Sequence, residues 1–210
     1  MINFLTILPL AFVMVAGPQI VSAIFLATSV RPHANSIAYL AGVALATALG
    51  TTIVYVLATI FDIERASTED SGAGPVDYAI IALLLGLTVR VYLRRNNTEP
   101  PAWMGRLETA TPELSFKLGF LLFILMPTDV ITMITVGTVL AREDLSLVHA
   151  LPFLLVTVLL VAIPLLILLL MGQRADVVLP RIRTWMSTNS WVVSEIVIVF
   201  FLVMAITGLS

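Results

Sequence analysis

The sequence "AGPQIVSAIFLATSVR", from Ala16 to Arg31, has a counterpart about a hundred residues later in "LMPTDVITMITVGTVLAR", from Leu125 to Arg142. Each stretch places a proline in the middle of an apolar run and follows it at once with polar side chains. Proline lacks a backbone N–H, and its ring clashes with the carbonyl four residues earlier. Each run is therefore predicted to be a helix that kinks or breaks, one near Pro18 and the other near Pro127.

The composition around these runs is that of a membrane protein. Of 210 residues, 60% are apolar and only 11% are charged, and the mean hydropathy is +1.07. A soluble domain is about half apolar and about a quarter charged. Because about twenty apolar residues cross the ~30 Å hydrocarbon core, the apolar runs predict six transmembrane helices. We place them at residues 4–29, 36–61, 76–93, 116–141, 149–171 and 190–209.

The basic residues predict the orientation of these helices. One side of the predicted bundle holds Arg31, Arg90, Arg94, Arg95, Arg106, Lys117, Arg174, Arg181 and Arg183, and the other side holds Arg65 and Arg142. By the positive-inside rule the richer side is cytoplasmic. We therefore expect a multi-pass protein of the cell membrane (inner or plasma membrane), with both termini outside the cytoplasm.

The two proline motifs also indicate an internal repeat. Aligning Pro18 with Pro127 places the first span on the fourth, the second on the fifth and the third on the sixth. Because each half has an odd number of spans, consecutive halves must be threaded in opposite directions, an arrangement typical of transporters. We predict an all-α membrane protein made of two inverted three-helix repeats, with proline-broken first and fourth helices. The repeats are residues 1–95 and 116–210, joined by a cytoplasmic linker at 96–115.

The polar residues that follow each proline predict a site near the middle of the membrane. Irregular backbone inside a bilayer is tolerated only where it faces protein or a polar cavity. Gln19 and Ser22 are three residues apart, as are Asp129 and Thr132, so each pair can share one helix face. The predicted substrate-binding residues are Gly17, Pro18, Gln19, Ser22, Pro127, Thr128, Asp129 and Thr132.

Two acidic residues are candidates for coupling transport to an ion. Asp129 lies about halfway along a predicted span, where a carboxylate costs ~2.5–3.5 kcal/mol, so it is expected to face the interior and to serve as a proton or cation relay. The alternative is that it only caps the half-helix that follows Pro127. Glu195 lies about a turn inside the sixth span, and the alternative there is that its side chain reaches the outer interface.

Other features point away from chemistry. The chain has no cysteine, no phosphate-binding glycine loop, no zinc spacing and no nucleophile motif. We expect neither an enzyme nor a protein with a cofactor, a metal site or a nucleic-acid partner. Gly42, Ala46 and Gly50 form a small-residue stripe whose default meaning is helix packing, with a sliding gate as the alternative. The segment "GQRADVVLPRIRTWMSTN" is predicted to be an interfacial loop, in which arginines either contact anionic lipid or only fix the topology.

The motifs "LPLAFVMVAGPQIVSAIFLATS", "AGVALATALGTTIVYVLA" and "MPTD", with the three-plus-three plan, resemble the lysine-exporter (LysE-type) superfamily. Within it they are most similar to the GAP family of glycolipid- or sulfolipid-addressing proteins. The resemblance implies a small six-span protein that moves a cell-envelope lipid or helps a larger exporter to do so. Related branches export amino acids or divalent cations, or carry electrons through a cysteine pair. The absence of cysteine excludes electron transfer, and the single carboxylate of "MPTD" argues against a metal-ion substrate.

Three functions remain open. The first is an alternating-access exporter or flippase of an amphiphilic cell-envelope (glyco)lipid. The second is a proton-coupled exporter of an amino acid or another small polar solute. The third is a non-transporting accessory subunit of a lipid exporter, bound to its partner through the small-residue stripe. A lateral opening toward lipid favours the first, an enclosed aqueous pocket the second and a filled core the third. The expected partners are membrane lipids, the lipid or solute substrate, and a second copy or a larger exporter complex.

Overall fold

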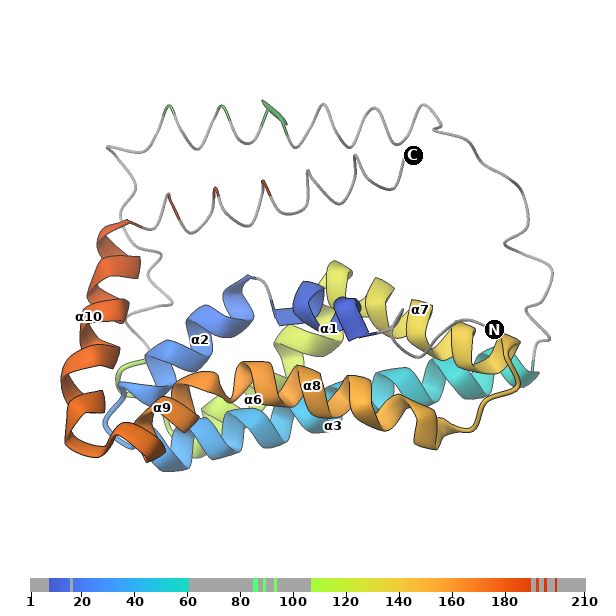
Figure 1. Cartoon of the computed structure of the whole chain (residues 1–210), viewed down its shortest axis with the longest axis horizontal. Helices are drawn as coiled ribbons and strands as arrows, with labels where there is room; N and C mark the ends of the chain where they lie inside the picture. Colours follow the sequence, from blue (N-terminus) through green and yellow to red (C-terminus); the bar gives the residue numbers. More distant parts are fainter. Residues whose placement is uncertain are drawn as a thin grey trace. The chain divides into compact units, whose positions relative to one another are not determined.

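The computed structural model describes residues 8–15, 17–60 and 107–189, together with Leu85, Gly86, Val89, Leu93, Val192, Glu195 and Val199. Within these residues the regular structure is helical and contains no strand (Figure 1). The third and sixth predicted spans lie mostly outside the described residues. The chain divides into two units, Met1–Ala66 with Ala102–Arg181, and Ser67–Pro101 with Ile182–Ser210. The features described below belong to the first unit unless stated otherwise.

The first predicted break lies at its proline. Helix α1 covers Leu8–Val15 and helix α2 covers Pro18–Ala27, and the two are bent by 65°. Pro18 is the first residue of α2, a position where its missing N–H has no helical partner to lose. Gly17 precedes it with a φ of +151°, a conformation that other residues rarely adopt.

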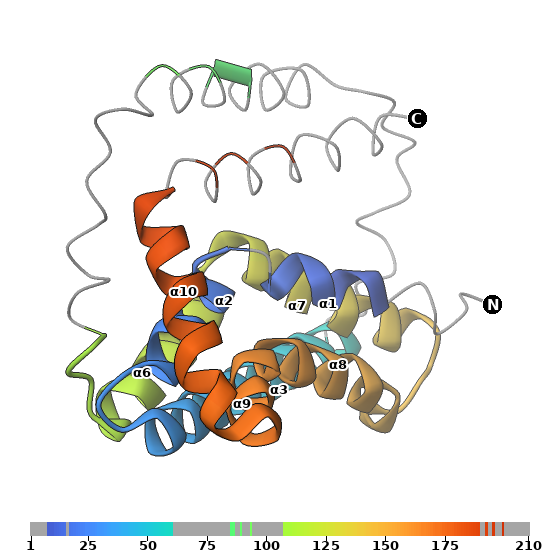
Figure 2. The ribbon, with the colours of Figure 1, turned by 60° about the vertical axis from the view of Figure 1, so that its left-hand side comes forward.

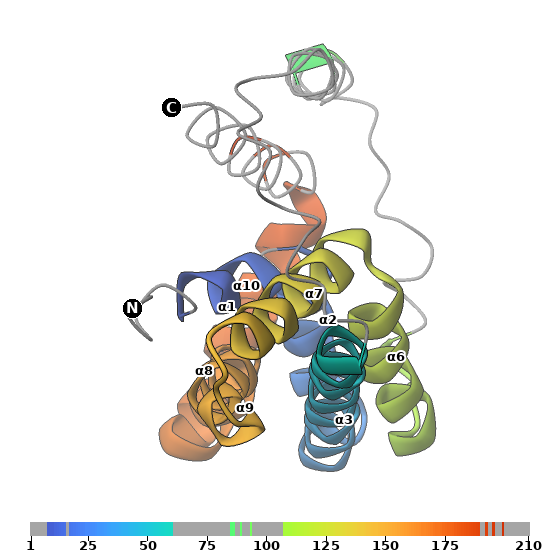
Figure 3. The same ribbon diagram turned by 90° about the vertical axis from the view of Figure 1, so that its right-hand side faces the viewer.

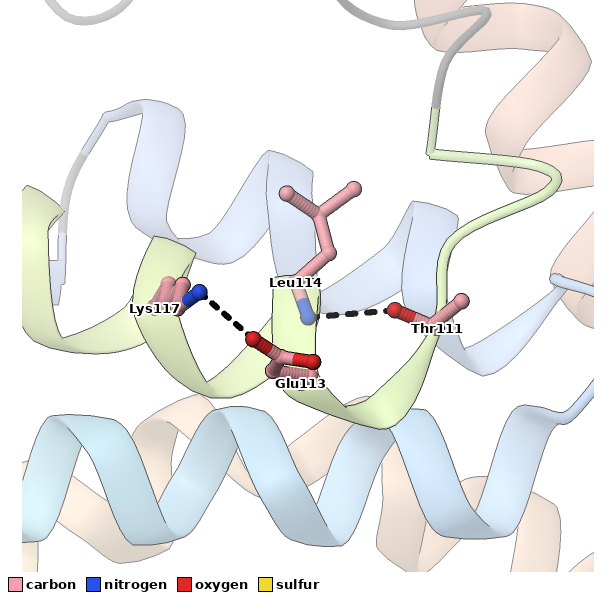
Figure 4. Close-up of polar contacts among 4 residues, drawn as sticks. All are labelled: Thr111, Glu113, Leu114 and Lys117. Atoms are coloured by element: carbon pink, nitrogen blue, oxygen red, sulfur yellow. Dashed lines mark hydrogen bonds and ion pairs between the residues drawn. The ribbon is translucent and has the colours of Figure 1, made fainter.

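The second predicted break has the same design. Helix α6 (Pro112–Leu125) begins after Thr111, whose Oγ1 accepts a hydrogen bond from Leu114 N at 3.3 Å. In its first turn Glu113 forms an exposed ion pair with Lys117 at 2.6 Å (Figure 4). Helix α7 (Pro127–Arg142) then starts at the second proline, and the two helices are bent by 67°. The predicted span at 116–141 thus begins a turn earlier, because the cap at Thr111 fixes its start.

A third break was not predicted. The short 3₁₀ helix η3 (Leu147–Ala150) leads into α8 (Leu151–Val161), and α9 (Ile163–Met171) follows at a bend of 58°. The cause is Pro164, the second residue of α9, which cannot donate to the carbonyl four residues earlier. Helix α3 (Pro32–Ile60) carries no internal proline and is continuous.

The segment predicted to be an interfacial loop is instead helical. After the short 3₁₀ helix η4 (Gly172–Arg174), helix α10 covers Ala175–Thr188 and tolerates Pro180 in its interior (Figure 2). The predicted connection between the fifth and sixth spans is therefore mainly helix, and its position at the membrane interface stays a prediction. The first turns of α10 pack on α2 and α9 in an apolar cluster, which consists of Ala27, Leu165, Leu168, Ala175 and Leu179.

Helix α3 lies between two groups of helices. In Figure 3, α6 is on one side of α3, and α8 and α9 are on the other. The broken pair α6 and α7 follows α3 in the same direction, since Gly42 meets α6 and Gly50 meets Met133 of α7. The broken pair α1 and α2 packs on the broken pair α8 and α9, with α1 against α8 and α2 against α9.

The small-residue stripe of α3 serves packing inside the chain. A Cβ added to Gly42 would fall on the Phe116 carbonyl and lie 2.9 Å from Phe120 N, so the two backbones are in contact there. Gly119 makes the reciprocal contact from α6 with the backbone of Tyr39. Because Gly42, Ala46 and Gly50 are all buried, the stripe offers no surface to a partner protein.

By length and composition, α3 alone among the described helices can cross a membrane, and up to four spans result if each bent pair counts as one. Exposed leucine, isoleucine and valine side chains are numerous along these helices. These are the features of an integral membrane protein.

Candidate functional site

The structure joins the two proline breaks through one hydrogen bond. Gln19, in the first turn of α2, donates from Nε2 to Asp129 Oδ2, in the first turn of α7, at 2.8 Å. The two side chains are 110 residues apart in sequence and are 2% and 0% exposed. Of the polar residues predicted to share a site, Gln19 and Asp129 are therefore in direct contact.

The carboxylate of Asp129 is surrounded by neutral groups. Its other oxygen, Oδ1, accepts from Thr128 Oγ1 at 3.3 Å. The hydrogen bonds to this carboxylate in the described part of the chain come from Gln19 and Thr128, and neither donor is charged. Arg142, the basic residue of α7, lies in the last turn of that helix, whereas Asp129 lies in the first. The positive end of α7 offers the carboxylate partial compensation.

Tyr39 brings helix α3 into the site. Its side chain is 1% exposed, and its hydroxyl donates to the backbone oxygen of Gln19 at 2.9 Å. The hydroxyl also lies near the side chains of Ser22 and Asp129. The sequence analysis did not include Tyr39 among the site residues. The available signal was a tyrosine in an apolar helix, since a buried phenol needs a polar partner.

Two polar atoms of the site have unused bonding capacity. Gln19 Oε1 and Ser22 Oγ are buried, and in the described part of the chain neither forms a hydrogen bond of standard geometry. Ser22 is 0% exposed. A buried polar atom without a partner is unfavourable by ~1–3 kcal/mol, so both atoms are candidates for contact with a bound group.

The remaining predicted residues are distributed as follows. Gly17 lies under the amide of Gln19, because a Cβ at this glycine would be 2.8 Å from Gln19 Oε1. Thr132 donates to the Thr128 carbonyl of its own helix at 2.8 Å. Glu195 belongs to the second unit and is half-buried, and its role in coupling stays a prediction.

A groove lies between α3 and the segment from η3 to the start of α8, and its lining includes none of the site residues named above. Its volume is about 290 Å³, and it is open on one side rather than enclosed. It is lined by Ala48, Thr51, Thr52, Leu147, Val148, Ala150, Leu151 and Leu154. Thr51 is 1% exposed, and its hydroxyl has no hydrogen-bond partner in the described structure. Outside the groove the same helices expose Leu49, Ile53 and Leu155, so it opens onto a surface suited to lipid.

Comparison with known proteins gives one family. No curated protein and no solved structure shows significant similarity to the chain. The family model described as "Sap, sulfolipid-1-addressing protein" matches residues 7–210. The match agrees with the predicted resemblance to sulfolipid-addressing proteins, while membership of the wider lysine-exporter superfamily remains a prediction. Because the match covers nearly the whole sequence, this chain belongs to the Sap (sulfolipid-1-addressing protein) family.

Proposed function

We propose that this protein is a small membrane transporter that exports or flips an amphiphilic cell-envelope lipid by alternating access around the two proline breaks. The observation that carries the lipid assignment is the open groove between α3 and α8. A lipid must enter a transporter sideways from the bilayer, whereas an amino acid needs an enclosed polar pocket. The family name, which refers to a sulfolipid, supports the same class of substrate.

The packing of the described helices supports the inverted repeat that alternating access requires. Exchanging the two halves turns the first span into the fourth and the second into the fifth. Helix α3 is the second predicted span and α6–α7 is the fourth, so the exchange turns their contact into a contact of α8–α9 with α1–α2. Both contacts are present. Six spans, two repeats and external termini are accordingly part of the proposal.

Asp129 is proposed as the coupling residue. Its hydrogen bond with Gln19 links a broken helix of one half to a broken helix of the other. A change in the charge or ligation of the carboxylate therefore changes the interaction between the halves, which is what coupling requires. Since the chain has no nucleotide-binding motif, the energy must come from an ion gradient, from the substrate gradient or from a partner.

The groove can be tested in proteoliposomes that contain the purified protein. A fluorescent sulfated glycolipid reports movement between leaflets through quenching by dithionite, and radiolabelled lysine reports the amino-acid alternative. Ala48→Phe fills the groove, and we expect it to slow lipid movement at least fivefold. Leu155→Phe places the same aromatic side chain on an exposed face of α8 and should leave the rate unchanged.

Three other results would redirect the assignment. Lipid movement that is equal in Ala48→Phe and wild type would remove the groove from the pathway. Uptake of lysine without lipid movement would favour the exporter of a small polar solute. The absence of both activities would favour the accessory subunit, which would then need a contact surface other than the buried small-residue stripe.

A further inference from the structure

We propose that the layer between the two breaks binds a monovalent metal cation, with Asp129 as the charged ligand and with Gln19 Oε1 and Ser22 Oγ as neutral oxygen ligands. The use of this ion in coupling rests on the proposed function, but its binding does not. The buried carboxylate of Asp129 accepts hydrogen bonds from the neutral side chains of Gln19 and Thr128.

The charge of the site selects a monovalent ion. A buried ion is strongly unfavourable unless an opposite charge compensates for it. One carboxylate is balanced by one positive charge, and no cluster of three or more carboxylate, imidazole or thiol groups suited to a metal occurs among the described residues. A divalent ion would leave the site with a net charge in a region from which water is excluded.

The unused oxygen atoms favour a metal ion over a proton. Asp129 alone can hold a proton and would need no further ligand. Gln19 Oε1 and Ser22 Oγ are nonetheless buried and unpartnered in the described structure. The hydrogen bond from Gln19 Nε2 to Asp129 Oδ2 holds the Gln19 amide against the carboxylate, and Ser22 follows three residues later on the same helix. An ion with several oxygen ligands would satisfy both atoms.

The helix breaks offer further ligands of the same kind. Pro18 and Pro127 have no N–H, so the carbonyls four residues earlier, of Met14 and Phe123, cannot receive the usual helical hydrogen bond. Met14 and Phe123 are both 0% exposed. Carbonyls freed at breaks in membrane helices are known ligands of alkali cations.

The test is direct binding of ²²Na⁺ to the purified full chain in detergent, measured without any lipid substrate, with K⁺, Li⁺ and choline as competitors. We expect saturable binding that unlabelled Na⁺ displaces and choline does not. Asp129→Asn should weaken binding at least a hundredfold. Ser22→Ala should weaken it at least tenfold without lowering the melting temperature, because no hydrogen bond of standard geometry is lost. Asp144→Asn, an exposed carboxylate at the end of α7, should bind as wild type does.

Two results would overturn the proposal. The first is the absence of saturable ²²Na⁺ binding by wild-type protein whose melting transition shows that it is folded. The second is Ser22→Ala and Asp129→Asn proteins that both bind Na⁺ as tightly as wild type. Since lipid is absent, either result would leave the proposed lipid transport standing, and a failure to move lipid would not affect the binding result.

Discussion

At the scale of single residues, the hydrogen bond from Gln19 Nε2 to Asp129 Oδ2 decides how two helices meet in the core. The carboxylate can only accept, so the amide nitrogen must be the atom that bonds to it, and the amide oxygen is not used in that bond. Gln19 Oε1 has no hydrogen-bond partner in the described structure, and it lies next to Gly17, which has no side chain. The two ends of the Gln19 amide thus differ: the nitrogen bonds to Asp129, and the oxygen has no hydrogen-bond partner in the described structure.

The contribution of this hydrogen bond can be measured with two substitutions. Asp129→Asn keeps an oxygen that accepts from Gln19, whereas Asp129→Ala leaves the Gln19 amide nitrogen buried without a partner. We expect the alanine variant to be less stable than the asparagine variant by about 1 kcal/mol, the usual range for hydrogen bonds between membrane helices. Thermal unfolding in detergent measures the difference, and equal melting temperatures would show that the bond does not join the helices.

Gly17 gives a second prediction at this scale. Gly17→Ala should destabilise the protein by ~1–3 kcal/mol, because the φ of +151° disfavours a side chain and the new Cβ would press on Gln19 Oε1. Gly86→Ala is the control, because a Cβ at this helical glycine meets nothing within 4 Å, and it should be neutral or slightly stabilising. Melting temperatures of both variants decide the matter, and a tolerated Gly17→Ala would contradict the described geometry of the break.

At the scale of helices, proline positions explain most of the architecture. Pro18 and Pro127 interrupt apolar runs and are followed by polar residues, so both breaks could be predicted from the sequence. The break at Pro164 could not be predicted on the same grounds, because the side chains around it are leucine and isoleucine and nothing polar follows. Helix α10 continues through Pro180, and its first turns pack through Ala175 and Leu179 on α2 and α9.

The contact of α3 with α6 yields a prediction for a helix pair. Gly42→Ala should lower the melting temperature strongly, because its methyl group would meet the backbone of α6 at Phe116, which cannot move aside alone. Gly50→Ala should have a smaller effect, because its neighbour is the flexible side chain of Met133. If Gly42→Ala is the milder of the two, the two helices are not packed backbone to backbone.

At the scale of the whole molecule, the question is how the chain crosses the bilayer. The bent pair of α6 and α7 is either one broken span or a re-entrant loop. Six spans and their orientation, expected from apolar length and charge bias, stay predictions. The two motifs predict that Gln19 and Asp129 lie together, and the structure places them in contact. The part played by Tyr39 depends on how α3 packs against α2, which no local pattern in the sequence encodes.

Single cysteines introduced into this cysteine-free chain distinguish the two topologies. Glu113→Cys places a thiol on the exposed first turn of α6, and Ser146→Cys places one on the exposed segment after α7. With an impermeant maleimide we expect labelling of Ser146→Cys on intact cells and of Glu113→Cys only after permeabilisation. The unsubstituted protein is the blank. Labelling of both positions from the same side would show a re-entrant loop.

The contact between the two proline breaks is the proposed centre of a lipid transporter, and lipid movement by variants of this contact tests that role. Movement of a fluorescent sulfated glycolipid across proteoliposome membranes is compared for wild type, Asp129→Asn and Asp144→Asn at equal amounts of folded protein. We expect lipid movement by wild type and by the exposed Asp144→Asn variant, and a rate that is at least tenfold lower in Asp129→Asn. Lipid movement by Asp129→Asn at the wild-type rate would contradict that role.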